Sequence, residues 1–249
     1  PTMFNFVNEL EEAKKFQMEY KKYFDDQTAT FTLTDQEEFD SQYLAAFQPK
    51  NIIISNLKKL TATNFSLLHN LQSLQLKNCN LQDCSFLDHP TFFSLLHLDL
   101  SQNHISNLQF LLPMLNLQQL NLESNQIPEL QLLYLSFLQL QKVNLKNCGL
   151  KNSKNFVVCA LENSKSSLAE VNFDVKWENL TNYEQLNPFN ATREGYMMQN
   201  KVEKQIKAQL ELMKLGEQQM LERVEDNLKV SVQMEEVMKG VQLEFTTLK

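Results

Sequence analysis

The sequence predicts an α/β solenoid: a curved parallel sheet of about five to six coils, with a helical N-terminal cap and a long C-terminal coiled-coil helix. Three observations support this prediction. The middle of the chain repeats one apolar pattern every 22 to 24 residues. The first 50 residues space apolar side chains three and four apart, and the last part carries a heptad seam. The predicted segments are 1–50, 51–180, a linker over 181–195, and 196–249.

Residues 1–50 are predicted to form two helices. From Met3 to Phe24, mainly apolar residues recur every three or four positions, which indicates an amphipathic helix. The stretch 34–37 has the spacing of a capping box, so we expect it to begin a second helix with Phe39, Tyr43, Leu44 and Phe47 on one face. Because the first coil of a solenoid exposes its interior, these helices are expected to cap it. For the first helix, binding to a partner is the open alternative.

Four segments between residues 71 and 150 share the pattern L-x-x-L-x-L-x-x-(N/C)-x-(L/I). They are LQSLQLKNCNL from Leu71, LLHLDLSQNHI from Leu95, LQQLNLESNQI from Leu117 and LQKVNLKNCGL from Leu140. An opening copy surrounds residues 51–55, and a degenerate copy begins at Leu168. These residues resemble the leucine-rich repeat family, in its short intracellular, phosphatase-regulator-like subclass. The resemblance covers about residues 48–180 and implies a cap after the last good copy, with a helix near 155–163 and a closing strand over 168–173.

The repeat has a direct physical interpretation. The alternating L-x-L core predicts a short strand with one buried face, and stacked coils bury what a single coil cannot. Asn103 and Asn125 occupy the turn, where a buried amide can bond the backbone of neighbouring coils. Cys79 and Cys148 take the same place in the other two copies, as small apolar fillers. The four cysteines of the chain show no disulfide framework.

The outward positions of the predicted strands form a polar, nearly neutral surface on the concave side. Such a surface suits a peptide or helix bound through hydrogen bonds and modest charge pairing, and the alternative is a solvated face with no partner. The residues expected to bind a partner there are Gln75, Lys77, His97, Asp99, Ser101, Asn121, Glu123, Asn144, Lys146, Asn172 and Asp174.

Residues 196–249 are predicted to form one long helix with an apolar seam that pairs with another chain. The seam residues are Ile206, Leu210, Met213, Met220, Val224, Met234, Met238, Val241, Phe245 and Leu248. Polar residues at 217, 227 and 231 interrupt the seam, which favours a specified register or a hetero-partner over a generic homodimer. The alternative is a helix that folds back on its own domain.

Composition excludes several functions. The four glycines lie far apart, so no glycine-rich phosphate loop exists, and we expect no cofactor, no metal and no small-molecule substrate. A net charge of −7 with no basic stretch argues against sequence-specific nucleic-acid binding. No apolar run is long enough for a membrane span, and no secretory signal is visible, so an intracellular protein is expected. His97 and Asp99 share a strand face, yet no motif places a nucleophile beside them.

The sequence therefore predicts a non-enzymatic adaptor of a larger intracellular assembly. The coiled coil would incorporate the chain, and the repeats would hold a second protein. By resemblance, small leucine-rich repeat proteins with coiled-coil tails belong to cytoskeletal and axonemal assemblies, which points to the cytoplasm, the cytoskeleton or the cilium. The alternatives are a nuclear ribonucleoprotein adaptor similar to the spliceosomal A-prime protein, and a regulatory subunit of a phosphatase or ligase.

Overall fold

The computed structural model describes residues 3–62, 64–150, 154–161, 164, 167–173, 197, 200–208, 211 and 214. The chain divides into two compact units, Pro1–Glu203 and Lys204–Lys249. The first unit holds the sheet and both helices with assigned bounds, α1 (Met3–Tyr20) and α2 (Lys154–Ala160). Residues 197, 200–208, 211 and 214 are helical as well. Within the described residues, none of the helices combines the length and hydropathy that crossing a bilayer requires.

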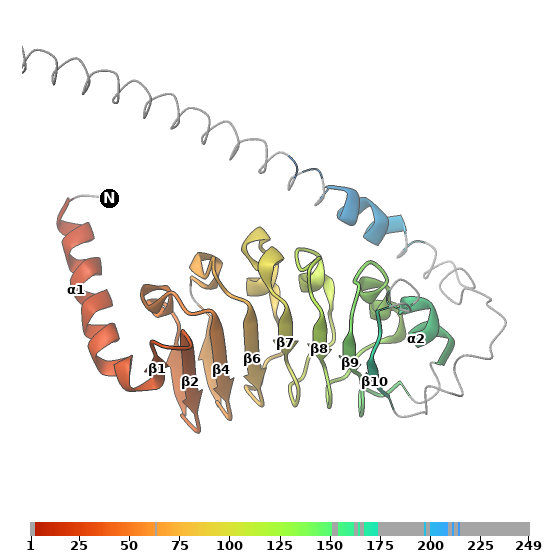
Figure 1. Cartoon of the computed structure of the whole chain (residues 1–249), viewed down its shortest axis with the longest axis horizontal. Coiled ribbons are helices and arrows are strands. Elements are labelled where there is room, and N and C mark those ends of the chain that lie inside the picture. Colours follow the sequence, from red (N-terminus) through yellow and green to blue (C-terminus); the bar gives the residue numbers. More distant parts are fainter. Residues whose placement is uncertain are drawn as a thin grey trace, which may run out of the picture. The chain divides into compact units, whose positions relative to one another are not determined.

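A mostly parallel sheet of eight strands forms the body of the first unit (Figure 1). Its strands are β1 (Phe24–Asp25), β2 (Thr30–Thr34), β4 (Asn51–Ser55), β6 (Ser73–Lys77), β7 (His97–Asp99), β8 (Gln119–Asn121), β9 (Lys142–Asn144) and β10 (Glu170–Asn172). They lie side by side in chain order, and only the β1–β2 pair is antiparallel. A separate parallel pair joins β3 (Glu38–Asp40) to β5 (Lys59–Thr61). Each successive coil thus adds one strand beside the previous one.

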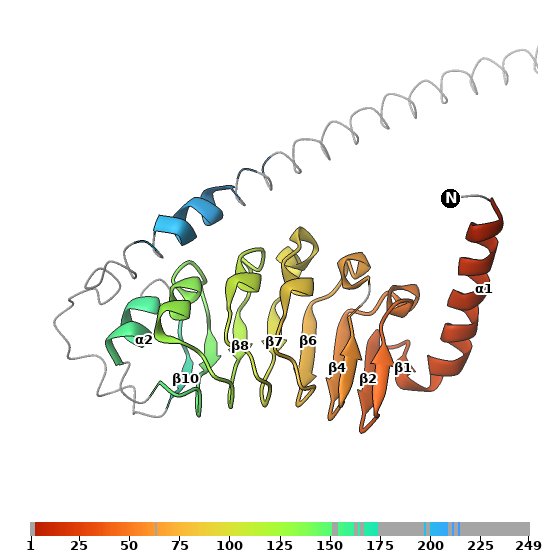
Figure 2. The same ribbon diagram turned by 180° about the vertical axis from the view of Figure 1, so that it is seen from behind.

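Short 3₁₀ segments connect the elements of the first unit: the first joins α1 to β1, and the others lie between strands and return the chain to the sheet (Figure 2). They span Lys21–Tyr23, Leu44–Phe47, Phe65–Leu67, Ser85–Leu87, Pro90–Ser94, Gln109–Leu111 and Glu129–Leu135. Helix α2 packs against the last of these, at the β10 end of the sheet. The core lies between the sheet and these segments. A row of buried side chains crosses six strands in register and forms part of this core: Phe31, Ile52, Leu74, Leu98, Leu120 and Val143. Each such burial stabilises the fold by roughly 1.5–3 kcal/mol.

Helix α1 lies beside the first coil and covers it with aromatic rings. The Phe16 ring lies 6.1 Å, centroid to centroid, from each of Phe39, Tyr43 and Phe47. The Tyr43 hydroxyl donates a hydrogen bond to Glu12 Oε2 at 2.5 Å, and this bond raises the pKa of Tyr43 to about 12. At this end of the sheet, the exposed interior of the first coil is therefore closed by the chain's own helix, as expected of a cap.

The predicted second helix in residues 1–50 is wrong. Residues Thr30–Thr34 form β2, which pairs in parallel with β4 along its whole length and buries Phe31 and Leu33. The stretch 34–37 begins no helix, since Asp35 adopts a left-handed φ of 56° and Phe39 lies in β3. Of the four residues expected on one helical face, Leu44 and Phe47 lie in a single 3₁₀ segment. Pairing with β4 and burial of two large side chains outweigh the local helical signal, and the sheet begins one coil before residue 51.

The other predicted elements are placed as follows. Strands β6 to β9 fall in the four pattern copies, β4 falls in the opening copy, and β10 falls within 168–173. Helix α2 begins and ends close to the predicted 155–163. Of the heptad seam, Ile206 lies in the helical stretch 200–208 and is half-buried. The remaining seam residues lie outside the described part of the chain, so the coiled coil stays a prediction.

Candidate functional site: the polar face of the sheet

A groove of about 280 Å³ runs across the face of the sheet opposite the core. Five successive strands, β6 to β10, contribute to it in register. Of the residues expected to bind a partner, the groove is lined by Gln75, His97, Asp99, Asn121, Asn144 and Asn172, together with Gln119, Lys142 and Glu170. The alternation of the strands explains the placement, because residues that flank a buried Leu or Val must point to the other face.

The central row of the groove consists of side chains that bond to their own strand ends. The Oδ1 atoms of Asp99, Asn121 and Asn144 accept hydrogen bonds from backbone N–H groups two residues later, at 2.8, 3.1 and 3.2 Å. Bonds also join neighbouring coils, since Asn121 Nδ2 donates to Asp99 Oδ2 at 3.0 Å and Asn144 Nδ2 donates to Glu123 Oε2 at 3.1 Å. The polar ladder therefore holds the strand ends in register and is a rigid surface, whereas its sequence suggested groups free for a partner.

A second row of side chains lies beside the central one, with one residue from each of β7 to β10. Its members, in register across these strands, are His97, Gln119, Lys142 and Glu170. Lys142 and Glu170 form an ion pair at 3.4 Å with both side chains about half exposed, which contributes at most ~1 kcal/mol. His97 Nδ1 is buried and has no hydrogen-bond partner within the described residues. A buried polar atom left unpaired costs roughly 1–3 kcal/mol, so this nitrogen is a local cost to the fold and is not a group exposed to the groove.

His97 and Asp99 share a strand face, but the structure does not join them by a hydrogen bond through Nδ1 of the histidine. Both oxygens of Asp99 are engaged by the Ser101 N–H and by Asn121, while His97 Nδ1 makes no bond to the carboxylate. An imidazole without an orienting carboxylate and without a neighbouring nucleophile lacks the geometry of nucleophilic catalysis.

Five of the residues expected on this face do not line the groove. Lys77, Glu123 and Lys146 come two residues after strand positions that line it and are not part of its lining, and Lys77 and Lys146 are exposed. Ser101 is wrongly predicted as a surface residue, because it is only 2% exposed in the turn after β7. Its carbonyl accepts the Asn78 N–H at 3.0 Å, which draws it into the turn between coils. Asp174 lies outside the described residues.

The turn asparagines behave as the sequence predicts. Asn103 Oδ1 accepts the backbone N–H groups of Cys79 and Leu81, both at 3.0 Å, and its Nδ2 donates to Leu76 O at 2.7 Å. Asn125 repeats this one coil later, with Ile105 N–H at 2.9 Å and Leu100 O at 3.0 Å. Both side chains are buried, so these amides join consecutive coils.

The buried cysteines are structural. The Cys148 thiol lies 3.0 Å from Leu122 O, and the Cys79 thiol lies 3.4 Å from Lys77 O. Burial raises the pKa of Cys79 to about 11 and that of Cys84 to about 12, so neither thiol ionises readily near neutral pH. Among the described residues, no group of three or more His, Cys, Asp and Glu side chains is placed to hold a metal ion.

Known proteins were compared with this chain at two levels. No protein-family model matches it, and no curated protein matches it.

Proposed function

We propose that this chain is a non-enzymatic scaffold of the leucine-rich repeat kind, which holds an extended segment of a partner protein across the polar face of its sheet. The observation that carries the proposal is the groove itself, which receives side chains from five successive strands in register. The in-register repeat and the coil-joining asparagines support the family assignment.

The shape of the groove favours a polypeptide over a small molecule. Small-molecule sites are enclosed and mostly apolar, whereas the side chains lining this groove are mainly polar. With strands about 4.8 Å apart, the row from β6 to β10 spans about 19 Å. An extended segment of about six residues covers that distance at about 3.3 Å per residue. A partner segment that crosses the strands can thus meet one side chain of every coil.

The chemistry of the groove predicts how the partner is held. Asp99, Asn121 and Asn144 are fixed by their own hydrogen bonds, so binding orders few side chains and the entropic cost is small. The imidazole of His97 and the amides of Gln75 and Gln119 can then bond the main chain of the partner. None of the described residues that line the groove is Phe, Tyr or Trp, so we expect moderate affinity carried by hydrogen bonds.

The C-terminal segment has the second role in this proposal. Its heptad seam would pair with a helix of another protein and so incorporate the chain into a larger assembly, leaving the sheet face available. On the resemblance to small repeat proteins with coiled-coil tails, we place that assembly in the cytoskeleton. The two contacts together would make the chain an adaptor.

A bulky substitution at the centre of the groove tests the proposal. Proteins from cell extract that bind the tagged full chain are identified by mass spectrometry. The affinity of each of these proteins is then measured for the unchanged chain and for the Gln119→Arg and Gln82→Arg variants. Gln119 lines the groove, whereas Gln82 is an exposed glutamine in a turn outside it. We expect Gln119→Arg to weaken one partner at least about tenfold, equivalent to ~1.4 kcal/mol, and Gln82→Arg to leave it unchanged. Full binding of every partner by Gln119→Arg would refute the proposal.

A further inference from the structure

A second groove, of about 550 Å³, lies between α1 and the first coil, away from the polar face of the sheet. On one side it is lined by Lys14, Gln17 and Met18 of α1 and by Lys21 of the 3₁₀ segment that follows the helix. These positions follow the i, i+3, i+4, i+7 spacing that places side chains along one stripe of a helix. The other side includes Phe24 and Phe47, which belong to β1 and to the 3₁₀ segment after β3.

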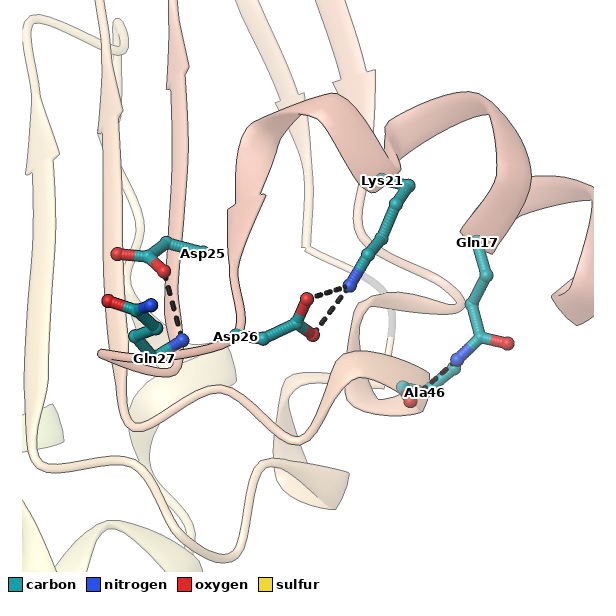
Figure 3. A network of polar contacts seen from close by, with 6 residues as sticks. All are labelled: Gln17, Lys21, Asp25, Asp26, Gln27 and Ala46. Carbon is teal, nitrogen blue, oxygen red and sulfur yellow. Dashed lines mark hydrogen bonds and ion pairs between the residues drawn. The ribbon is translucent and has the colours of Figure 1, made fainter.

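Polar contacts fix both walls of this groove (Figure 3). Gln17 Nε2 donates to Ala46 O at 2.8 Å, which joins α1 to the 3₁₀ segment. Lys21 Nζ lies 2.5 and 2.6 Å from the two carboxylate oxygens of Asp26, and Asp25 Oδ1 accepts the Gln27 N–H at 2.9 Å in the turn that follows. The groove is therefore held open by contacts within the chain, in a shape that needs little rearrangement before binding.

The floor and lip of the groove are apolar. The rings of Phe24 and Phe47 lie 5.0 Å apart, centroid to centroid, and both residues are only half-buried. Met18 stands beside them with 77% of its surface exposed, more than any other large apolar residue among those described. Methionine packs adaptably against aromatic rings, so this cluster can receive an apolar side chain from a partner.

The charge at the rim is positive. Lys21 is neutralised by Asp26, while Lys14 forms no ion pair with any described side chain. None of the described glutamates of α1 lines the groove, and Glu12 bonds to Tyr43 instead. A partner that places a carboxylate near Lys14 would thus meet an unpaired cation, whereas a basic partner would be repelled.

We infer that this groove binds an amphipathic helix of a partner protein, with an apolar side chain against Met18, Phe24 and Phe47 and an acidic side chain near Lys14. The stripe from Lys14 to Lys21 is about 10 Å long at 1.5 Å per residue, which matches about two turns of a docked helix. A helix laid beside α1 meets the stripe with its own i, i+3, i+4 face. This surface is independent of the groove on the sheet.

The test is selection of a displayed library of random peptides against the full chain, followed by fluorescence polarisation with the selected peptides. Selected peptides are expected to combine helical apolar spacing with an acidic residue. Met18→Asp should weaken them at least about tenfold, while Leu67→Asp, at another exposed apolar residue outside the groove (51% exposed), should not. Since Met18 is exposed, the variant is expected to keep the fold, which far-UV circular dichroism checks.

Charge reversal at Lys14 measures the electrostatic contribution to peptide binding separately from the apolar one. Lys14→Glu should weaken the acidic peptides about two- to five-fold, as expected of an exposed ion pair, and a peptide with its acid changed to lysine should regain affinity for this variant only. Lys15→Glu on the same helix is the matched control, since Lys15 does not line the groove. Selection of no peptide, of basic peptides, or of peptides insensitive to Met18→Asp would overturn the inference. The inference would also be overturned if the chain forms a dimer and Met18→Asp dissociates that dimer, because a second copy of the chain would then occupy the groove.

Discussion

Replacing Asn103 with alanine is expected to destabilise the protein far more than the loss of one small polar side chain suggests. The buried Asn103 amide is the acceptor for two backbone N–H groups, those of Cys79 and Leu81, each at 3.0 Å. Alanine leaves both donors buried and unpaired, at roughly 1–3 kcal/mol each. We therefore expect the free energy of unfolding to fall by about 4 kcal/mol.

The equivalent position in the preceding coil supplies the control. Cys79 fills that place with a thiol that only donates weakly, to Ile54 O at 3.6 Å and Lys77 O at 3.4 Å. Cys79→Ala leaves no N–H group unpaired and is expected to cost about 1 kcal/mol, mainly for the lost packing. The two variants therefore separate the hydrogen-bonding role of the turn residue from its volume.

Urea unfolding followed by circular dichroism gives both values, and the slope of each transition checks that unfolding stays comparable. Amide hydrogen exchange provides a local readout, since the Cys79 and Leu81 amides should lose protection in Asn103→Ala before their neighbours do. If Asn103→Ala costs no more than Cys79→Ala, or if both amides keep their protection, the amide does not join the coils as described here.

Four further outcomes are expected. Ser124 adopts a left-handed φ of 57°, so Ser124→Asn should raise the free energy of unfolding by roughly 0.5–1 kcal/mol in urea titrations, and a loss would contradict the role of this turn. Phe16→Ala should cost about 2–3 kcal/mol and make α1 sensitive to limited proteolysis, because the ring anchors the helix on the first coil. Burial raises the pKa of Cys79 to about 11 and of Cys84 to about 12, above the usual 9.0. Folding therefore favours the protonated thiols, and the stability they contribute should be complete below about pH 9 and fall as pH rises toward 11, which urea titrations at several pH values check. Both thiols should also resist alkylation at neutral pH until the protein unfolds, which mass spectrometry of pulse-labelled protein measures.

The sequence predicts the central coils well because every coil repeats the same requirement. The leucines that flank each outward residue must enter the core, so β6 to β9 follow from the pattern alone. The same alternation is present in Thr30–Thr34, where Phe31 and Leu33 occupy the two buried positions. This strand pairs residue for residue with β4. A search restricted to leucine misses this coil, and the four-residue spacing of Phe39, Tyr43 and Phe47 resembles a helix. Pairing with the distant strand β4 decides between helix and strand. A local sequence pattern carries no information about that pairing.

The candidate sites could be predicted only in part. Alternation places Gln75, Asp99 and Asn121 on the outward face, which the groove confirms as their location. Whether such a side chain is free depends on bonds made after the chain has turned, such as the Asn121 to Asp99 bond between coils. The unpartnered Nδ1 of His97 and the groove beside Met18 likewise arise from packing between separate elements, so no local sequence signal points to them.

Site-specific photocrosslinking at position 119 tests the central claim most directly. A benzophenone side chain is introduced there in the full chain, and at position 82 as the control, and both proteins are irradiated in cell extract. The account predicts a single prominent protein adduct through position 119 that is absent through position 82. Irradiation that yields no adduct at position 119, or the same adducts at both positions, would show that the polar face of the sheet holds no partner.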